Sequence, residues 1–147
     1  MTLKRMFTTQ VVESDTFFAL PLPARQLYFH ICLHCDDDGF CDCMEMVRRL
    51  CGSTAAAVKA LVDAGYLIKF LNVYAVTHFR VQNKIRKDRL HECRYPELAS
   101  VIYVLPDGTY TTDPFPNCPT LLETRYYPEN KNDRQMSGNS LTDGGLI

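Results

Sequence analysis

The sequence predicts an α+β fold built around three consecutive helices and a short hairpin. Two helical patterns, at residues 43–51 and 53–64, are separated by a single glycine, and two strand-like runs, at residues 66–70 and 73–79, follow directly. An amphipathic pattern that begins at Pro23 supplies an earlier helix. A helix-turn-helix followed by a hairpin is the arrangement of a winged helix. We therefore expect a winged helix-turn-helix, with a three-helix core, a small antiparallel β wing, a short C-terminal extension and a disordered tail.

The first helix of this core is expected to begin at Pro23, because proline suits the first turn of a helix. Its apolar residues recur at helical spacing and should face the core: Ala24, Leu27, Tyr28, Ile31 and Cys35. The helix should end at the Asp36-Asp37-Asp38-Gly39 turn, whose carboxylates can accept hydrogen bonds from the nearby backbone. Residues 40–41 are expected to form a short third strand beside the wing.

The two motif helices and the wing have local signals at their ends. Gly52 can adopt a positive φ and should end the first motif helix, and Ser53 should cap the second. Asn72 tolerates the left-handed conformation and should form the turn of the wing. The residues expected to face inward are Cys43, Val47, Leu50 and Cys51 in the first helix, and Val58, Leu61 and Val62 in the second.

Composition divides the chain into a predicted domain at residues 1–112 and a tail at residues 113–147. Near the end of the domain, Pro106-Asp107-Gly108 predicts a turn between two short strands, which would form a small C-terminal hairpin. The tail consists largely of prolines, glycines and polar residues. It therefore offers too little apolar area to offset an ordering entropy of roughly 1–2 kcal/mol per residue, and we expect it to be disordered.

Charge is unevenly distributed along the chain. The formal net charge is -1, but residues 80–94 contain six Lys or Arg and two acids, which gives this segment +4 and the remainder -5. Basic charge is therefore concentrated directly behind the wing, as expected of a protein that contacts nucleic acid.

The sequence has neither a secretory signal nor an apolar run of the roughly 18 residues that a membrane span requires. We therefore expect a cytoplasmic protein without membrane association. In that compartment its seven cysteines should be free thiols rather than disulfides.

Four motifs of the chain resemble one family in the same order. They are RMF near the start, SDTFFALPLPARQLYFH, DDDGF, and IRKDR after the wing. Over about residues 5–112 the sequence resembles the N-terminal domain of phage replisome organizer proteins, the replication-initiation proteins of phages and prophages of Gram-positive bacteria. The resemblance implies a winged-helix domain that binds double-stranded DNA at a replication origin in the bacterial cytoplasm. It also implies contacts with helicase-loading or other host replication proteins.

The candidate DNA-binding residues lie on the two motif helices, at the tip of the wing and in the basic segment behind it. Lysine and arginine contact phosphates and fix the register of a protein on a duplex. The second motif helix has few side chains suited to base edges, so one copy should discriminate weakly, and several copies would act together as a homo-oligomer on DNA. The predicted contacts are Arg48, Arg49, Ser53, Ala56, Lys59, Asn72, Arg80, Lys84, Arg86, Lys87 and Arg89. If about four of them neutralise phosphates, log K should fall against log salt with a slope near -4.

Neither a cofactor, a metal nor catalysis is expected. Cys32, Cys35, Cys41 and Cys43 lie close in sequence, but their spacing is not that of a zinc knuckle, and small buried thiols are ordinary core residues. The Asp36-Asp37-Asp38 turn is explained by solvated acids, because neither a second acidic motif nor a phosphate-binding glycine loop accompanies it. The histidines have no evident nucleophile partner, so we expect a protein that is not an enzyme.

Two alternative functions remain open. The bare outward face of the second motif helix is compatible with a winged-helix module that binds proteins of the replication machinery instead of DNA. A winged-helix transcription regulator would use the same DNA chemistry and differ only in its target site.

Overall fold

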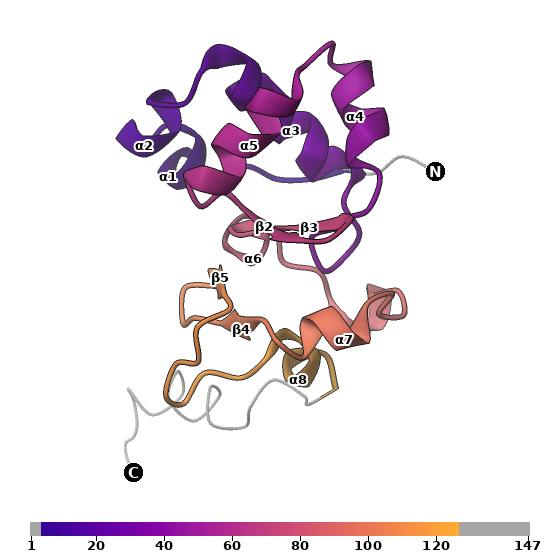
Figure 1. Cartoon of the computed structure of the whole chain (residues 1–147). Coiled ribbons are helices and arrows are strands. Elements are labelled where there is room, and N and C mark those ends of the chain that lie inside the picture. The colour runs from indigo at the N-terminus through magenta and orange to yellow at the C-terminus, as the bar shows by residue number, and fades with distance from the viewer. Residues whose placement is uncertain (1–3, 127–147) are drawn as a thin grey trace.

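The computed structural model describes residues 4–126, which form a mixed α+β fold and confirm the predicted class (Figure 1). Helices α1 to α5 lie on one side of a small sheet, and the elements that follow it lie on the other side (Figure 1). None of the helices in the described residues is long and apolar enough to cross a membrane. In chain order the elements are α1 (Thr9–Val12), α2 (Asp15–Phe18), α3 (Leu22–His34), β1 (Phe40–Cys41), α4 (Met44–Leu50), α5 (Ala55–Asp63), β2 (Leu67–Phe70), β3 (Val73–Val76), α6 (Phe79–Gln82), the 3-10 helix η1 (Lys87–Arg89), α7 (Pro96–Ala99), β4 (Tyr103–Val104), β5 (Tyr110–Thr111) and α8 (Leu121–Tyr126).

Helix α3 is the centre of the core and packs against α4, α5 and β1. All of its predicted inward residues are buried, which confirms the helical periodicity: Ala24, Leu27, Tyr28, Ile31 and Cys35. The Phe17 ring packs edge-on against Tyr28, with ring centroids 5.4 Å apart, and Gln82 donates a hydrogen bond of 3.0 Å to the buried Tyr28 hydroxyl. Burial of each large apolar side chain contributes roughly 1.5–3 kcal/mol, so α3 holds the helical layer together.

The main sheet has the strand order β1-β3-β2, with every pair antiparallel. Phe40 lies opposite Ala75, which confirms residues 40–41 as a third strand beside the hairpin. Gly39, just before β1, has a φ of 90° and lies so close to Phe79 that a Cβ there would come within 2.7 Å of that side chain. The turn of Asp36, Asp37 and Asp38, hereafter the acidic turn, is thereby fixed at the edge of the sheet.

The connection between α4 and α5 differs from the prediction at the helix cap. Gly52 has a φ of 62° and ends α4 as predicted. The cap of α5 is Thr54, whose Oγ1 accepts the Ala57 amide at 3.3 Å, and not Ser53. The predicted cap was therefore one residue too early. The Ser53 side chain is instead buried in the turn.

One apolar position and one turn residue were wrongly predicted. Leu50 is 65% exposed, because α4 ends at this residue and buries Met44 and Val47 instead. In the two-residue turn of the hairpin, Leu71 and not Asn72 has the positive φ, at 38°.

The ordered chain continues past the predicted domain boundary at residue 112. Helix α8 lies within the stretch predicted to be disordered, and its Leu121 is fully buried. Arg125 of the same helix forms an ion pair with Asp38 of the acidic turn, and both side chains are almost fully buried. The boundary was placed too early because few apolar residues mark this helix in a proline-rich stretch. The remainder of the predicted tail, residues 127–147, lies outside the described residues.

The predicted C-terminal hairpin is confirmed as the pair β4 and β5. Its turn contains Gly108, which has a φ of 99° and lies against the backbone of Arg80, where a Cβ would come within 2.9 Å of the carbonyl oxygen. Tyr110 is buried, and its hydroxyl donates a hydrogen bond of 2.7 Å to the Asp38 carbonyl oxygen. The C-terminal elements therefore pack closely on α6 and on the acidic turn.

Candidate nucleic-acid interface

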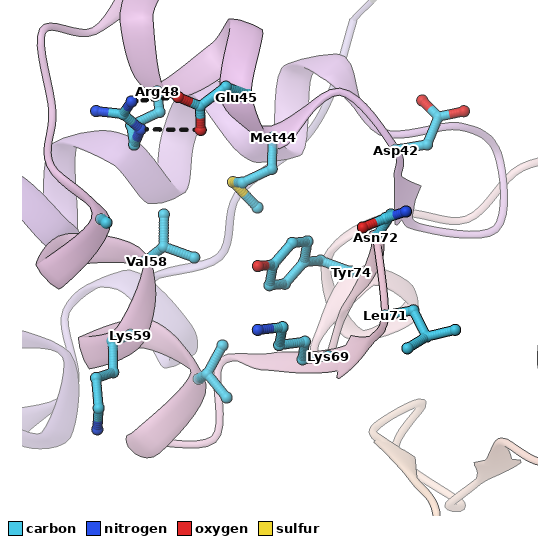
Figure 2. A pocket seen from close by; sticks show the side chains of 12 residues that line it. Asp42, Met44, Glu45, Arg48, Val58, Lys59, Lys69, Leu71, Asn72 and Tyr74 are labelled. Atoms are coloured by element: carbon cyan, nitrogen blue, oxygen red, sulfur yellow. Dashed lines mark hydrogen bonds and ion pairs between the residues drawn. The ribbon is translucent and has the colours of Figure 1, made fainter.

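Several candidate DNA-binding residues line a groove between α4, α5 and the β2-β3 hairpin (Figure 2). Its volume is about 740 Å³. Met44, Val58 and Tyr74 form its apolar floor, and charged or amide side chains stand around this floor (Figure 2). The lining residues are Asp42, Met44, Glu45, Arg48, Ala55, Val58, Lys59, Val62, Lys69, Leu71, Asn72 and Tyr74. Three predicted contacts, Arg48, Lys59 and Asn72, are thus brought together here.

Arg48 holds the turn between the two helices rather than standing free in the groove. Its guanidinium pairs with Glu45 one turn earlier, and its Nη1 donates a hydrogen bond of 2.9 Å to the Ser53 carbonyl oxygen. The hydrogen bond and charge of Arg48 lower the pKa of the Glu45 carboxyl, so this acid is ionised at neutral pH. Because its donors already have partners, Arg48 is a weaker candidate for phosphate than its position on the helix suggested.

Lys59 and Lys69 are the cations most available at the groove. The Lys59 side chain is 76% exposed, and its Nζ lies 2.6 Å from the exposed Asp63 carboxylate. Such an exposed pair is held weakly, so a phosphate can replace the carboxylate. Lys69 is exposed on β2 and has no ion-pair partner among residues 4–126. Its side chain lies beside Tyr74, whereas Lys59 points away from that ring at the rim of the groove (Figure 2).

The first turn of α5 presents only small side chains to solvent. Thr54, Ala55 and Ala56 at its first turn are exposed, and Ser53 is buried with its Oγ lacking a hydrogen-bond partner. Ser53 therefore cannot offer its hydroxyl to DNA, contrary to the prediction, whereas Ala56 is accessible as predicted. Small side chains allow a phosphate backbone to approach the helix closely, but they carry no donor or acceptor for base edges.

The tip of the hairpin carries one strained and exposed apolar residue. Leu71 is 91% exposed and has a φ of 38°. The left-handed region is unfavourable for a leucine by roughly 1–2 kcal/mol. In Figure 2 the Leu71 side chain points away from the groove floor, whereas Asn72 next to it stands at the groove edge.

The basic segment, defined as residues 80–89, does not line the groove. It begins in α6, which lies on the opposite side of the main sheet from α4 and α5 (Figure 1). Arg80 is half-buried there and donates a hydrogen bond of 2.7 Å to Thr124 of α8, so it joins two parts of the fold. Arg86 pairs with Asp88 at 3.0 Å, and both are exposed. Lys84, Lys87 and Arg89 are exposed on the same segment.

Arg49 is the remaining predicted contact. Its side chain is 75% exposed, and its Nε lies 3.7 Å from Glu45. It faces a shallow hollow formed with Met46 and Leu50 on the outer side of α4, away from the floor formed by Tyr74. The structure thus divides the predicted contacts among the groove, the outer face of α4 and the basic segment.

The acidic turn is not solvated, contrary to the prediction. Asp36 Oδ1 accepts the amides of Asp38 and Phe40, each at 2.9 Å, as expected for such a turn. Burial is the main influence on Asp36 and raises its pKa. Partial burial opposes ionisation of Asp37, but the hydrogen bonds and charge of His91, with the charge of Arg5, outweigh it and lower the pKa of Asp37. Asp37 pairs with Arg5 and His91, and Asp38 pairs with Arg125, so these two acids are engaged by side chains of the protein itself.

The Asp42 carboxylate fixes the chain that follows the basic segment, residues 94–95, by a hydrogen bond and an ion pair. Tyr95 donates its hydroxyl to Asp42, and Arg94 pairs with the same carboxylate at the end of the groove. The Tyr95 hydrogen bond is the largest influence on Asp42 and lowers its pKa, while the same bond raises the pKa of Tyr95 to about 12. Asp42 is thus ionised and already paired, which reduces its repulsion of a polyanion at the groove.

The cysteines are held as free thiols in the described part of the chain. Burial raises the pKa values of Cys32 and Cys41 to about 12, so neither is a thiolate at neutral pH. Within residues 4–126 no group of three or more His, Cys, Asp or Glu side chains is arranged to hold a metal ion.

Two groove residues were missed by the sequence analysis. Lys69 is exposed although alternation along β2 places it on the same face as the buried Leu67, so strand parity alone did not reveal it. The sequence carries no signal for Leu71, because hairpin turns usually have glycine or asparagine at a position of positive φ.

No family model, curated protein or solved structure matches the chain.

Proposed function

We propose that the chain is a DNA-binding protein in which residues 22–76 form a winged helix. In this proposal α4 and α5 are the helix-turn-helix and the β2-β3 hairpin is the wing. The observation that carries it is the groove between α5 and the hairpin, where Lys59 and Lys69 stand exposed on opposite walls. Two exposed cations on a helix and a hairpin that flank one groove, together with a helix turn of small side chains, suit a phosphate backbone.

The geometry supports binding that depends on the DNA backbone more than on base sequence. The first turn of α5 presents Thr54, Ala55 and Ala56, which allow close approach but carry little base-reading capacity. Asn72 at the tip of the hairpin is the groove residue best suited to hydrogen bond a base edge. Specific sites would then need repeated contacts by several copies, or DNA of a particular shape.

The biological role that we propose is replication initiation in a phage or prophage. The four motifs that resemble replisome organizer proteins support it, and two of them now have a structural explanation. The DDDGF motif forms the acidic turn and its glycine, which pack against Phe79. The SDTFFALPLPARQLYFH motif forms α2 and the start of α3, with Phe17 and Tyr28 in contact in the core. These motifs thus support the proposed fold directly and the role at an origin only through the resemblance.

A protein-binding module is the second candidate, and the outer face of α4 favours it. Met46 and Leu50 are 47% and 65% exposed on this face, beside Arg49. Exposed apolar side chains next to a charge are typical of the core and rim of protein interfaces. This face lies outside the groove, so both functions could be present in one chain.

The test compares two variants that each remove two positive charges. Lys59→Ala with Lys69→Ala alters the groove, and Arg86→Ala with Arg89→Ala alters the basic segment. Fluorescence anisotropy would follow binding to a labelled random duplex across a salt series. We expect the groove variant to reduce the slope of log K against log salt by about 2, since each phosphate contact contributes about 0.9.

The matched variant should change that slope by less than half as much. An equal loss of affinity for duplexes of different sequence would agree with contacts to the DNA backbone. A slope altered only by the basic-segment variant would move the interface to residues 84–89. Absence of binding to any duplex at low salt would reject DNA binding and favour the protein-binding module.

A further inference from the structure

We propose that Leu71 is an apolar wedge that enters the minor groove of the bound duplex and separates one base step. This inference rests on the proposed DNA binding and extends it to the kind of DNA that the chain prefers. The ligand would be A·T-rich duplex with a flexible pyrimidine–purine step, such as TA, beneath the hairpin tip.

The fold gives no reason for a leucine at this position. Leu71 is 91% exposed, so its side chain adds almost nothing to the core. Its φ of 38° lies in the region that glycine or asparagine occupies with less strain, and an asparagine is the next residue. A residue that is both strained and exposed is most simply explained by a contact outside the chain.

The surroundings of Leu71 fit nucleic acid better than a protein pocket. The neighbouring exposed residues at the tip are Lys69 and Asn72, which are polar, and Leu71 points away from the apolar floor of the groove (Figure 2). A protein pocket would be expected to cover a cluster of apolar side chains, whereas a wedge is a single apolar residue flanked by groups that bind phosphates and base edges. Lys69 can contact a phosphate, and Asn72 can hydrogen bond the minor-groove edge of an A·T pair.

The wedge would supply a sequence preference that α5 does not. The exposed first turn of α5 offers mainly alanines and a threonine to DNA. Opening a base step costs less free energy where stacking is weak, so discrimination would arise from deformability rather than from base-edge hydrogen bonds. The bound DNA should therefore be bent at the step that Leu71 enters.

The experiment uses the full chain and two duplexes of equal length, one A·T-rich with a central TA step and one G·C-rich. Each carries a donor and an acceptor dye at its ends to measure bending, and the TA duplex carries 2-aminopurine at the central step. We expect the natural chain to bend the TA duplex, raise the 2-aminopurine fluorescence and bind this duplex about tenfold more tightly. Leu71→Gly should abolish bending, fluorescence change and preference, while affinity for the G·C-rich duplex changes less than twofold.

Leu50→Ala is the matched control, because it also removes an exposed leucine but lies outside the groove. It should leave all three signals unchanged. Circular dichroism should show Leu71→Gly to be folded, since glycine relieves the positive φ. If Leu71→Gly bends and prefers the TA duplex as the natural chain does, while the Lys59→Ala and Lys69→Ala variant loses affinity, the wedge is wrong and the proposed function stands. If the natural chain binds neither duplex at low salt, the proposed function fails and the wedge fails with it.

Discussion

The groove and the acidic turn contain the same kinds of charged side chains but differ in how deeply these are buried. At the acidic turn, Arg125 and Asp38 have side chains only 7% and 3% exposed. At the groove rim, Lys59 and Asp63 are 76% and 60% exposed. A buried pair cannot lose one partner without leaving an unpaired charge, whereas an exposed pair is worth little and can be exchanged. Burial, rather than the number of basic residues in a segment, therefore separates structural cations from those available to a ligand.

This distinction changes the significance of the basic segment. The charge excess at residues 80–94 includes Arg80, which is half-buried and bonded to Thr124, and Arg94, which is 54% exposed but already paired with Asp42. Lys69 lies outside that excess and is exposed in the groove. Local charge density in the sequence thus overstates the phosphate-binding capacity of one region and understates that of another.

The largest effect is expected from breaking the buried pair. Asp38→Asn should lower the free energy of unfolding by about 3–5 kcal/mol, because the buried Arg125 guanidinium loses its counter-charge. Asp63→Asn at the exposed pair is the matched control and should change it by less than about 0.5 kcal/mol. Urea denaturation followed by circular dichroism would measure both. Equal effects of the two substitutions would remove the proposed difference between the regions.

The second prediction compares two leucines near helix ends. Leu121→Ala should destabilise the protein by about 2–5 kcal/mol, because Leu121 is fully buried and its removal leaves a cavity. Leu50→Ala should be close to neutral, since Leu50 is 65% exposed. Thermal unfolding of both variants would test this. A neutral Leu121→Ala would restore the predicted boundary at residue 112 and show that α8 adds little to the domain.

The sequence was sufficient for the parts of the fold that depend on local periodicity. The spacing of Ala24, Leu27 and Ile31 predicted α3, and the short runs around residues 71–72 predicted the hairpin. Contacts between distant segments could not be predicted, because the pairing of Arg125 with Asp38 joins residues 87 positions apart. Leu121 was missed for a related reason: one buried leucine in a proline-rich stretch has no periodic partners, and only the site into which it packs makes it a core residue.

The structure brings only some of the predicted contact residues together. Lys59 and Asn72 line the groove, Lys59 from α5 and Asn72 from the turn between β2 and β3. Ser53 was misassigned because Ser and Thr are both good caps, and the chain uses Thr54. Arg48 lies at the predicted place, but its side chain is engaged by Glu45 and the Ser53 carbonyl, which no helical pattern reveals.

A smaller effect is expected at the tip of the hairpin. Leu71→Gly should stabilise the protein by up to about 1 kcal/mol, because relief of the positive φ exceeds the added entropy of glycine in the unfolded chain. Leu71→Ala keeps the strain and removes the same side chain, so it should not stabilise the protein. Urea denaturation of the two variants separates backbone strain from side-chain contacts. A loss of stability in both would mean that the leucine packs within the fold, which would weaken the case for an external ligand.

The smallest expected effect concerns Asp42, which lines the groove and pairs with Arg94 in the chain that follows the basic segment. Its folded-state pKa is lowered, chiefly by the Tyr95 hydrogen bond and then by the charge of Arg94. A lowered carboxyl pKa contributes stability that is fully present above the unfolded value, near 3.9, and is lost as the pH falls through the folded value. Asp42 should therefore stabilise the protein at neutral pH and cease to do so only below about pH 4. Tyr95→Phe removes the largest cause, so the pKa of Asp42 should rise toward its ordinary value in an NMR titration of the carboxyl carbon, while that of Glu45, paired with Arg48 instead, should not change. If the pKa of Asp42 is unmoved, the Tyr95 hydrogen bond is not the main cause of the lowered value, and Arg94 holds the ionised carboxylate instead.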